Sequence, residues 1–168
     1  MEIQIKPVTT ESEINEIAGL AKIIWNDHYV SIIGKDQVNY MLGKYQTPKA
    51  ISAQIDKDGF EYLLIIADEL TVGYIGIIQR HNELFLSKFY ILDSERGKGI
   101  GHAGLEFLKS RCQASGTDFI TLTVNKNNLS AILAYEKMGF EKYGEVESDI
   151  GAGYVMDDYL MRLRINPR

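Results

Sequence analysis

A glycine-rich stretch in the second half of the chain has the composition of an anion-binding loop. The stretch follows an apolar run and opens a helix-forming segment, and it reads Arg96-Gly97-Lys98-Gly99-Ile100-Gly101. Glycines leave backbone N–H groups unobstructed, and the first turn of a helix adds free amides and the positive end of the helix dipole. A phosphate or pyrophosphate is the anion that such a loop favours. We therefore predict a phosphate site here, to which Arg96 and Lys98 add positive charge.

Three kinds of phosphate site compete for this loop, besides a plain helix start that binds nothing. A Walker A loop needs Ser or Thr directly after its lysine, whereas Gly99 follows Lys98. The segment 99–104 fits the G-x-G-x-x-G fingerprint of dinucleotide-binding folds, but that site also needs an acidic residue about 20 positions later. The next apolar run ends Val124-Asn125-Lys126 and offers no carboxylate there. A third kind of phosphate loop fits these residues better.

Two motifs, in the right order, resemble the signatures of the GNAT N-acetyltransferase superfamily. The first is its acetyl-CoA loop, Gln/Arg-x-x-Gly-x-Gly/Ala, whose fixed positions are held here by Arg96, Gly99 and Gly101. The second is Asn-x-x-Ala-(three residues)-Tyr followed by Gly-Phe, which matches residues 128–135 and Gly139-Phe140. With the order of the strands, the resemblance covers essentially the whole chain. Length and ending also loosely resemble bacterial spermine/spermidine acetyltransferases.

The resemblance implies that acetyl-CoA is the co-substrate and indicates which residues hold it. The strand before the loop would pair with the pantetheine amides, the loop would hold the pyrophosphate, and the next helix would line the far side of the pantetheine arm. Carried onto this chain, the coenzyme residues are Phe89, Tyr90, Ile91, Arg96, Gly97, Lys98, Gly99, Ile100, Gly101, Asn128 and Ala131. The residues alone give Asn128 a second interpretation, because asparagine is a good helix N-cap.

Tyr135 is the expected catalytic acid, because family members place a tyrosine at this position to protonate the departing thiolate. A tyrosine hydroxyl can do so when it is held within hydrogen-bond reach of the sulfur. The structural alternative is a helix residue that packs on Phe140. No covalent intermediate on the enzyme is expected, so the lone Cys112 is interpreted as a core residue.

The general base is where this chain departs from its relatives. Several of them carry a glutamate on the strand before the loop, at positions that are occupied here by Phe85 and Ser87. An ammonium group with a pKa of about 10 must still lose a proton before it attacks. We therefore expect a water relay through Ser87, with Glu83 and His28 as weaker candidates.

Two segments are candidates for contact with the acceptor. Trp25 and Tyr29 lie near the end of the first long helical segment, where aromatic faces could take a cationic amine or pack in the core. The segment from Gly151 to Tyr159 carries paired carboxylates between tyrosines, which would either attract an amine or solvate an edge strand. Asp157 is the expected contact in that pair.

The predicted function is transfer of an acetyl group from acetyl-CoA directly to a primary amine, such as a polyamine or another small amine. Acetylation of a protein N-terminus and a non-catalytic acetyl-CoA sensor are the alternatives. The residues do not identify the acceptor, the base or the oligomeric state; the resemblance adds that a homodimer is common in the family.

Apolar periodicity predicts the elements that position these residues. Helices are expected over 11–28, 34–45, 48–57, about 101–115 and 128–138, and strands over 3–8, 61–67, 72–79, 84–92, 119–124, about 141–148 and 153–165. A helix joins the strands at 84–92 and 119–124, so these two should be parallel and the others antiparallel. The result is an α/β (α+β) fold with a GNAT-like mixed, mostly antiparallel sheet of six to seven strands, a parallel pair at its centre and flanking helices. Local signals include a capping box at Thr10 and Glu13 and a left-handed helix stop at Gly139.

Composition limits the remaining possibilities. The 168 residues suit one domain over 1–168, since domains run to about 100–200 residues. Eighteen basic and twenty-three acidic side chains give a net charge of −5, which argues against nucleic acid as a partner. One cysteine excludes an internal disulfide, and the three histidines lack metal-ligand spacing, so no metal is expected. Without a leader or a long apolar run, we expect a soluble cytoplasmic protein with no membrane partner.

Overall fold

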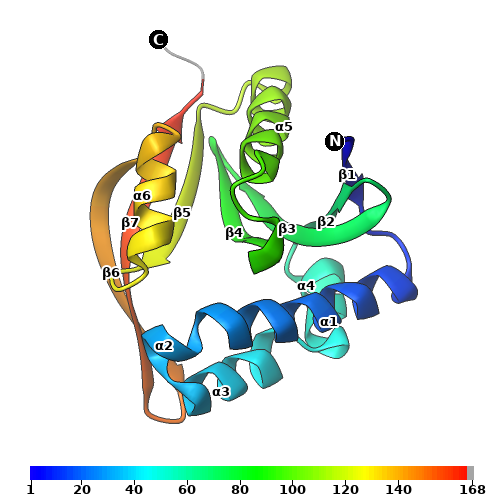
Figure 1. Ribbon diagram of the computed structural model, residues 1–168. Coiled ribbons are helices and arrows are strands. Elements are labelled where there is room, and N and C mark those ends of the chain that lie inside the picture. Colours follow the sequence, from blue (N-terminus) through cyan, green and yellow to red (C-terminus); the bar gives the residue numbers. More distant parts are fainter. Residues whose placement is uncertain (166–168) are drawn as a thin grey trace. The chain divides into compact units, whose positions relative to one another are not determined.

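The structure is a computed structural model that describes residues 1–165, so the last three residues of the predicted 1–168 domain lie outside it. Every predicted helix and strand is present, and two short helices, α2 and η1, are additional. In chain order the elements are β1 (Ile3–Pro7), α1 (Glu11–His28), α2 (Val30–Ile33), α3 (Lys35–Tyr45), α4 (Pro48–Lys57), β2 (Glu61–Ala67), β3 (Leu70–Arg80), β4 (Glu83–Ile91), η1 (Asp93–Glu95), α5 (Ile100–Ser115), β5 (Phe119–Asn125), α6 (Leu129–Lys137), β6 (Glu141–Gly151) and β7 (Tyr154–Arg164) (Figure 1).

The strands form one sheet of seven, in the order β1-β2-β3-β4-β5-β7-β6. β4 and β5 run parallel, with Glu83–Phe85 paired to Phe119–Thr121. The pairs β1–β2, β2–β3, β5–β7 and β6–β7 are antiparallel. The predicted mixed, mostly antiparallel sheet with a parallel pair at its centre is therefore confirmed.

The turn between β2 and β3 is shorter than the four-residue turn that the sequence suggests. Asp68 and Glu69 both adopt left-handed backbone angles, with φ of 48° and 72°. A two-residue hairpin turn with positive φ at both positions matches the twist of the flanking strands. β3 therefore begins at Leu70 instead of Val72.

The chain divides into two compact units, which are described separately. The first comprises residues 1–78 and 88–107, and the second comprises residues 79–87 and those from Leu108 on. In the first unit α1 packs against α3 and α4 (Figure 1). The apolar core of this unit includes Ile17, Ile24, Val38, Ile51, Leu63 and Ile65.

In the second unit α6 lies over the strands β5, β7 and β6 (Figure 1). Gly139 ends this helix with a φ of 100°, as predicted, and a Cβ added there would lie 3.2 Å from Leu163 of β7. Cys112 is a fully buried core residue, as predicted, with Leu108, Ile120, Leu122, Ile132, Phe140 and Met161 around the same core.

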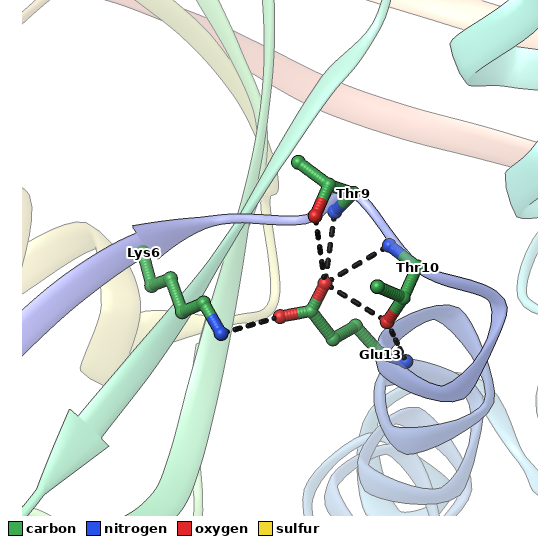
Figure 2. Close-up of polar contacts among 4 residues, drawn as sticks. All are labelled: Lys6, Thr9, Thr10 and Glu13. Carbon is green, nitrogen blue, oxygen red and sulfur yellow. Dashed lines mark hydrogen bonds and ion pairs between the residues drawn. The ribbon is translucent and has the colours of Figure 1, made fainter.

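A capping box fixes the start of α1. The Thr10 hydroxyl accepts from the Glu13 N–H, and Glu13 Oε1 accepts from the N–H groups of Thr9 and Thr10 at 2.9 and 3.0 Å (Figure 2). Lys6 of β1 adds an ion pair of 3.0 Å to the other carboxylate oxygen. These contacts hold the pKa of Glu13 near 2, first through the Thr9 amide and then through Lys6. The predicted capping box is confirmed, and the same carboxylate joins β1 to α1.

A buried lysine lies on β4 in the first unit. Lys88 is 8% exposed, and its Nζ donates to Gln54 Oε1 at 3.0 Å. The same nitrogen lies 4.6 Å from the ring centroid of Phe60 and 5.2 Å from that of Tyr62, within the range of cation–π attraction. Burial lowers the pKa of Lys88 to about 8, because the charged form loses its water here.

Replacing Lys88 by methionine should stabilise the protein at pH 7. The lysine pKa falls from 10.5 in the unfolded chain to about 8 in the fold, so the unfolded chain binds more protons between these values and wild-type stability should rise with pH there. Lys88→Met removes the charge and should add up to about 3 kcal/mol at pH 7. Urea unfolding of both proteins from pH 7 to 10.5 measures this difference. A difference that does not shrink as the pH rises contradicts the assignment.

Glu13→Gln should flatten the acid dependence of stability while keeping the capping geometry, because a glutamine oxygen can still accept from the Thr9 and Thr10 amides. The carboxylate has a folded pKa of about 2 against 4.5 unfolded. Its contribution is therefore complete above pH 4.5 and is lost as the pH falls towards 2. Urea midpoints of wild type and variant should converge over this window. Parallel curves for the two proteins would show that the carboxylate charge contributes nothing.

Candidate active site

The glycine loop has the backbone geometry that an anion site requires. Gly97 and Gly99 have φ of 77° and 82°, a left-handed conformation that costs other residues roughly 1–2 kcal/mol. Ile100 is fully buried and anchors the first turn of α5. Helix geometry leaves the amides of Ile100, Gly101 and His102 without acceptors inside the helix. These amides and the helix dipole together favour an anion at this end of α5.

The basic side chains of the loop are each matched by an acidic one. Arg96 Nε lies 3.8 Å from Asp93 Oδ1, and Lys98 Nζ lies 3.1 Å from Glu95 Oε2. Both acids belong to η1, which precedes the loop. Exposed pairs of this kind are worth at most about 1 kcal/mol, so either basic side chain can exchange its partner for a phosphate at little cost.

The end of β4 is packed closely between β3 and α5 within the first unit. A Cβ added to Gly73 would lie 2.3 Å from the carbonyl oxygen of Tyr90, and one added to Gly104 would lie 2.8 Å from Phe89 Cζ. Small residues are therefore required on both sides of Phe89 and Tyr90. Gly104 thus permits helix–strand contact, which explains the last glycine of the G-x-G-x-x-G match without a dinucleotide.

The structure brings one expected coenzyme residue together with the two expected acceptor residues, Trp25 in α1 and Tyr29 at its C-cap. Trp25 stacks on Tyr29 with ring centroids 4.4 Å apart. Tyr90 meets Trp25 edge-on at 5.7 Å and Tyr29 at 6.1 Å, and its other side contacts Tyr74 at 5.5 Å. Trp25 is only 4% exposed, so its ring supports Tyr29 and Tyr90 from inside the first unit.

The second unit carries the expected residues of α6. Asn128, Ala131 and Tyr135 are three and four residues apart, a spacing that puts them on one face of the helix. Tyr135 is half-buried and contacts Phe140 edge-on at 5.3 Å. Asn128 is the N-cap residue, as its residue type predicts, although its side chain makes no capping hydrogen bond. Its carbonyl accepts from Ile132 N–H, while its Oδ1 accepts from the Ser130 hydroxyl at 3.4 Å.

The second unit also holds Ser87 and the acidic pair of β7. Ser87 is half-buried on β4. Asp157 is exposed, and its Oδ1 lies 2.9 Å from Lys126 Nζ. Its neighbour Asp158 is buried and its Oδ1 has no hydrogen-bond partner. Asp158 was not singled out by sequence reasoning, because adjacent strand residues point to opposite faces and the sequence does not say which face is covered.

Metal sites and membrane-spanning helices are two other kinds of functional feature. Across residues 1–165, no three His, Cys, Asp or Glu side chains are grouped so that they could hold a metal ion. No helix in the same part of the chain combines the length and the apolar character needed to cross a membrane.

Comparisons with known proteins agree with this geometry. A family model described as an acetyltransferase (GNAT) domain matches residues 29–156. The L-methionine sulfoximine/L-methionine sulfone acetyltransferase of Pseudomonas aeruginosa is 30% identical over 155 residues, which cover 91% of this chain and 86% of that protein.

Two solved structures share the fold. The PaiA N-acetyltransferase of Thermoplasma acidophilum, in complex with coenzyme A, has a TM-score of 0.81 at 18% identity, over 98% of this chain and 99% of that one. A chimera of the Vibrio cholerae spermidine N-acetyltransferase SpeG and hSSAT has a TM-score of 0.72 at 16% identity, over 98% and 96% of the two chains. From the family match over most of its length and from its curated relative, this chain belongs to the GNAT superfamily of N-acetyltransferases, a membership that supports acetyl-CoA as its co-substrate.

Proposed function

We propose that this chain transfers the acetyl group of acetyl-CoA directly to the primary amine of a small molecule. In this reaction the amine nitrogen forms a bond to the acetyl carbonyl carbon, and the bond between that carbon and the coenzyme sulfur breaks. The left-handed glycines 97 and 99, set before the first-turn amides of α5 that have no acceptor inside the helix, are the observation that carries the proposal.

Residues of the first unit are proposed to bind the coenzyme. The amides of the loop from Arg96 to Gly101 would receive the pyrophosphate, with charge from Arg96 and Lys98. The backbone of Phe89, Tyr90 and Ile91 would pair with the pantetheine amides. Support comes from the close packing that glycines 73 and 104 permit on either side of this segment, because a fixed strand end presents its backbone groups in one orientation.

Residues of the second unit are proposed for the chemistry. Tyr135 would donate its proton to the departing sulfur, while Asn128 and Ala131 on the same face of α6 would contact the pantetheine arm. The contact with Phe140 is the one that the structural alternative expects, so support for the catalytic role comes from the helical spacing that puts Tyr135 on the same face of α6 as Asn128 and Ala131. Ser87 is proposed as a relay for the proton that the ammonium group loses.

The acceptor is proposed to be a small amine, and two chemical classes deserve the first trials. A polyamine was expected from the sequence, and a spermidine acetyltransferase shares the fold. An amino-acid derivative is favoured by the 30% identical relative, which is named for L-methionine sulfoximine and L-methionine sulfone. Within α1 and β4, Tyr29 and Tyr90 offer half-buried aromatic faces to either amine.

Gly99→Glu should abolish acetyl-CoA binding, because a side chain and a negative charge would occupy the proposed pyrophosphate site. The matched control is Gly59→Glu, since Gly59 also has a left-handed φ, of 76° against 82°, and open space around it. Titration calorimetry with acetyl-CoA should give at least a 100-fold weaker Kd for the first variant and an unchanged Kd for the second. Equal weakening in both would show that the loop is not the coenzyme site.

Tyr135→Phe should lower kcat by about 100-fold, the lower end of the usual effect of a general acid, and leave acetyl-CoA affinity unchanged. The measurement is thiol release with a panel of polyamines, amino-acid derivatives, aminoglycosides and short peptides. Tyr143→Phe is the control, because Tyr143 is an exposed tyrosine of the same unit. Full turnover by Tyr135→Phe at saturating acetyl-CoA would remove Tyr135 from the mechanism.

A further inference from the structure

Asp158 is a buried carboxylate in the middle of β7. It is 6% exposed, and its Oδ1 has no hydrogen-bond partner. In the sheet it lies opposite Asn125, the last residue of β5, and opposite Val146 of β6. Opposed residues of paired strands share a face of the sheet, so Asp158 lies beside one neutral amide and one apolar side chain, at the carboxyl end of β5.

The adjacent carboxylate of Asp157 has a different environment. Successive strand residues point to opposite faces, and Asp157 lies opposite Glu147 on the face away from Asp158. Lys126, which follows β5, pairs there with Asp157 at 2.9 Å and with Glu145 at 2.6 Å. Lys126 therefore already has two carboxylate partners, and neither is Asp158.

The charges around Asp158 leave it ionised and without a counterion at neutral pH. The pKa of Asp158 is raised to about 6, first by burial and then by the neighbouring Asp157, while Lys126 lowers it. Val146 and Asn125, the residues opposite it, carry no charge. At pH 7 most molecules thus hold a buried carboxylate that no cation neutralises, an arrangement that reduces stability.

Such a group is suited to a cationic substrate. A carboxylate whose pKa is shifted towards neutral pH, and one oxygen of which is buried without a hydrogen-bond donor, suits a general base. It also favours an ammonium group over a neutral one, because the incoming cation compensates a charge that is already buried. β4 contains one carboxylate, Glu83, at its first residue, and the positions at which several relatives carry a glutamate hold Phe85 and Ser87. A serine hydroxyl such as that of Ser87 can relay a proton but cannot keep it.

We propose that Asp158 is a catalytic residue of the acceptor site, whose carboxylate binds the primary ammonium of the acceptor and takes its proton. The inference rests on the proposed acetyl transfer. The first ammonium proton goes to Asp158, and the free amine then attacks the thioester carbon. As the C–S bond breaks, the proposed acid Tyr135 gives its proton to the sulfur, and the second proton leaves the nitrogen through water and restores the Tyr135 hydroxyl. Asp158 afterwards returns its proton to water.

Asp158→Asn tests this role because it keeps the shape of the side chain and removes its charge. With an amine that the wild type accepts, kcat/KM should fall by at least 100-fold. Wild-type kcat/KM should decline below about pH 6, where the carboxylate becomes protonated, and this acid limb should be missing in the variant. Acetyl-CoA affinity should stay within twofold of wild type, and the melting temperature at pH 7 should rise because an uncompensated charge is gone.

Two further variants sharpen the result. Glu147→Gln removes an exposed carboxylate from the neighbouring strand and should leave kcat/KM unchanged. Asp157→Asn asks whether the exposed member of the pair is the acceptor contact instead. If Asp157→Asn removes the acid limb and Asp158→Asn keeps it, the assignment to Asp158 is wrong.

The inference can also be overturned without a folded variant. Wild-type kcat/KM that stays flat from pH 5 to pH 7.5 for an accepted amine excludes a base that titrates as Asp158 does. If Asp158→Asn is as active as the wild type, the role of Asp158 is refuted while the proposed function is not. If, by contrast, no amine of the panel supports thiol release by the wild type, the proposed function itself is refuted, and with it the role of Asp158.

Discussion

Two parallel neighbours in a sheet cannot be joined by a tight turn, and this constraint organises the functional part of the molecule. β4 and β5 are parallel, so α5 has to carry the chain back between them. The start of that helix therefore follows the carboxyl end of β4 after residues 92–99, which include η1 and the left-handed Gly97 and Gly99. Unpaired amides at the first turn of α5 are a consequence of the topology, and the glycines keep them accessible to an anion.

Two buried residues of the sheet, Lys88 and Asp158, show how the cost of burying a charge is handled in different ways. Lys88 is surrounded by an amide oxygen and aromatic rings, which stabilise a cation in part. Asp158 has an amide and an apolar residue opposite it and an Oδ1 without a donor. The lysine is thus solvated by its surroundings, whereas the aspartate keeps its capacity to bind a cation. This difference distinguishes a structural group from a candidate reactive one.

The aromatic residues of α1 connect packing with the proposed chemistry. Core packing and acceptor contact were alternative interpretations of Trp25 and Tyr29, and the structure gives them different surroundings. Trp25 is enclosed and supports the rings of Tyr29 and Tyr90, while those two tyrosines remain half-buried. Since both tyrosines pack on Trp25, a change at Trp25 would alter the position of both rings.

The sequence by itself determined the order of the elements, the parallel pair, the capping box at Glu13 and the glycine loop, because each depends on signals within a few residues. Among the points that it did not settle, two depended on tertiary contacts. The side-chain role of Asn128 depended on which groups approach the start of α6, and the covered face of β7, which carries Asp158 and not the expected Asp157, depended on the neighbouring strands. Both faces of β7 carry apolar residues, such as Met156 and Leu160 on one and Met161 and Leu163 on the other, so alternation cannot identify the covered face. Only the pairing of β7 with β5 and β6 decides which face of β7 is covered, because burial and the position of Lys126 are set by residues distant in the chain.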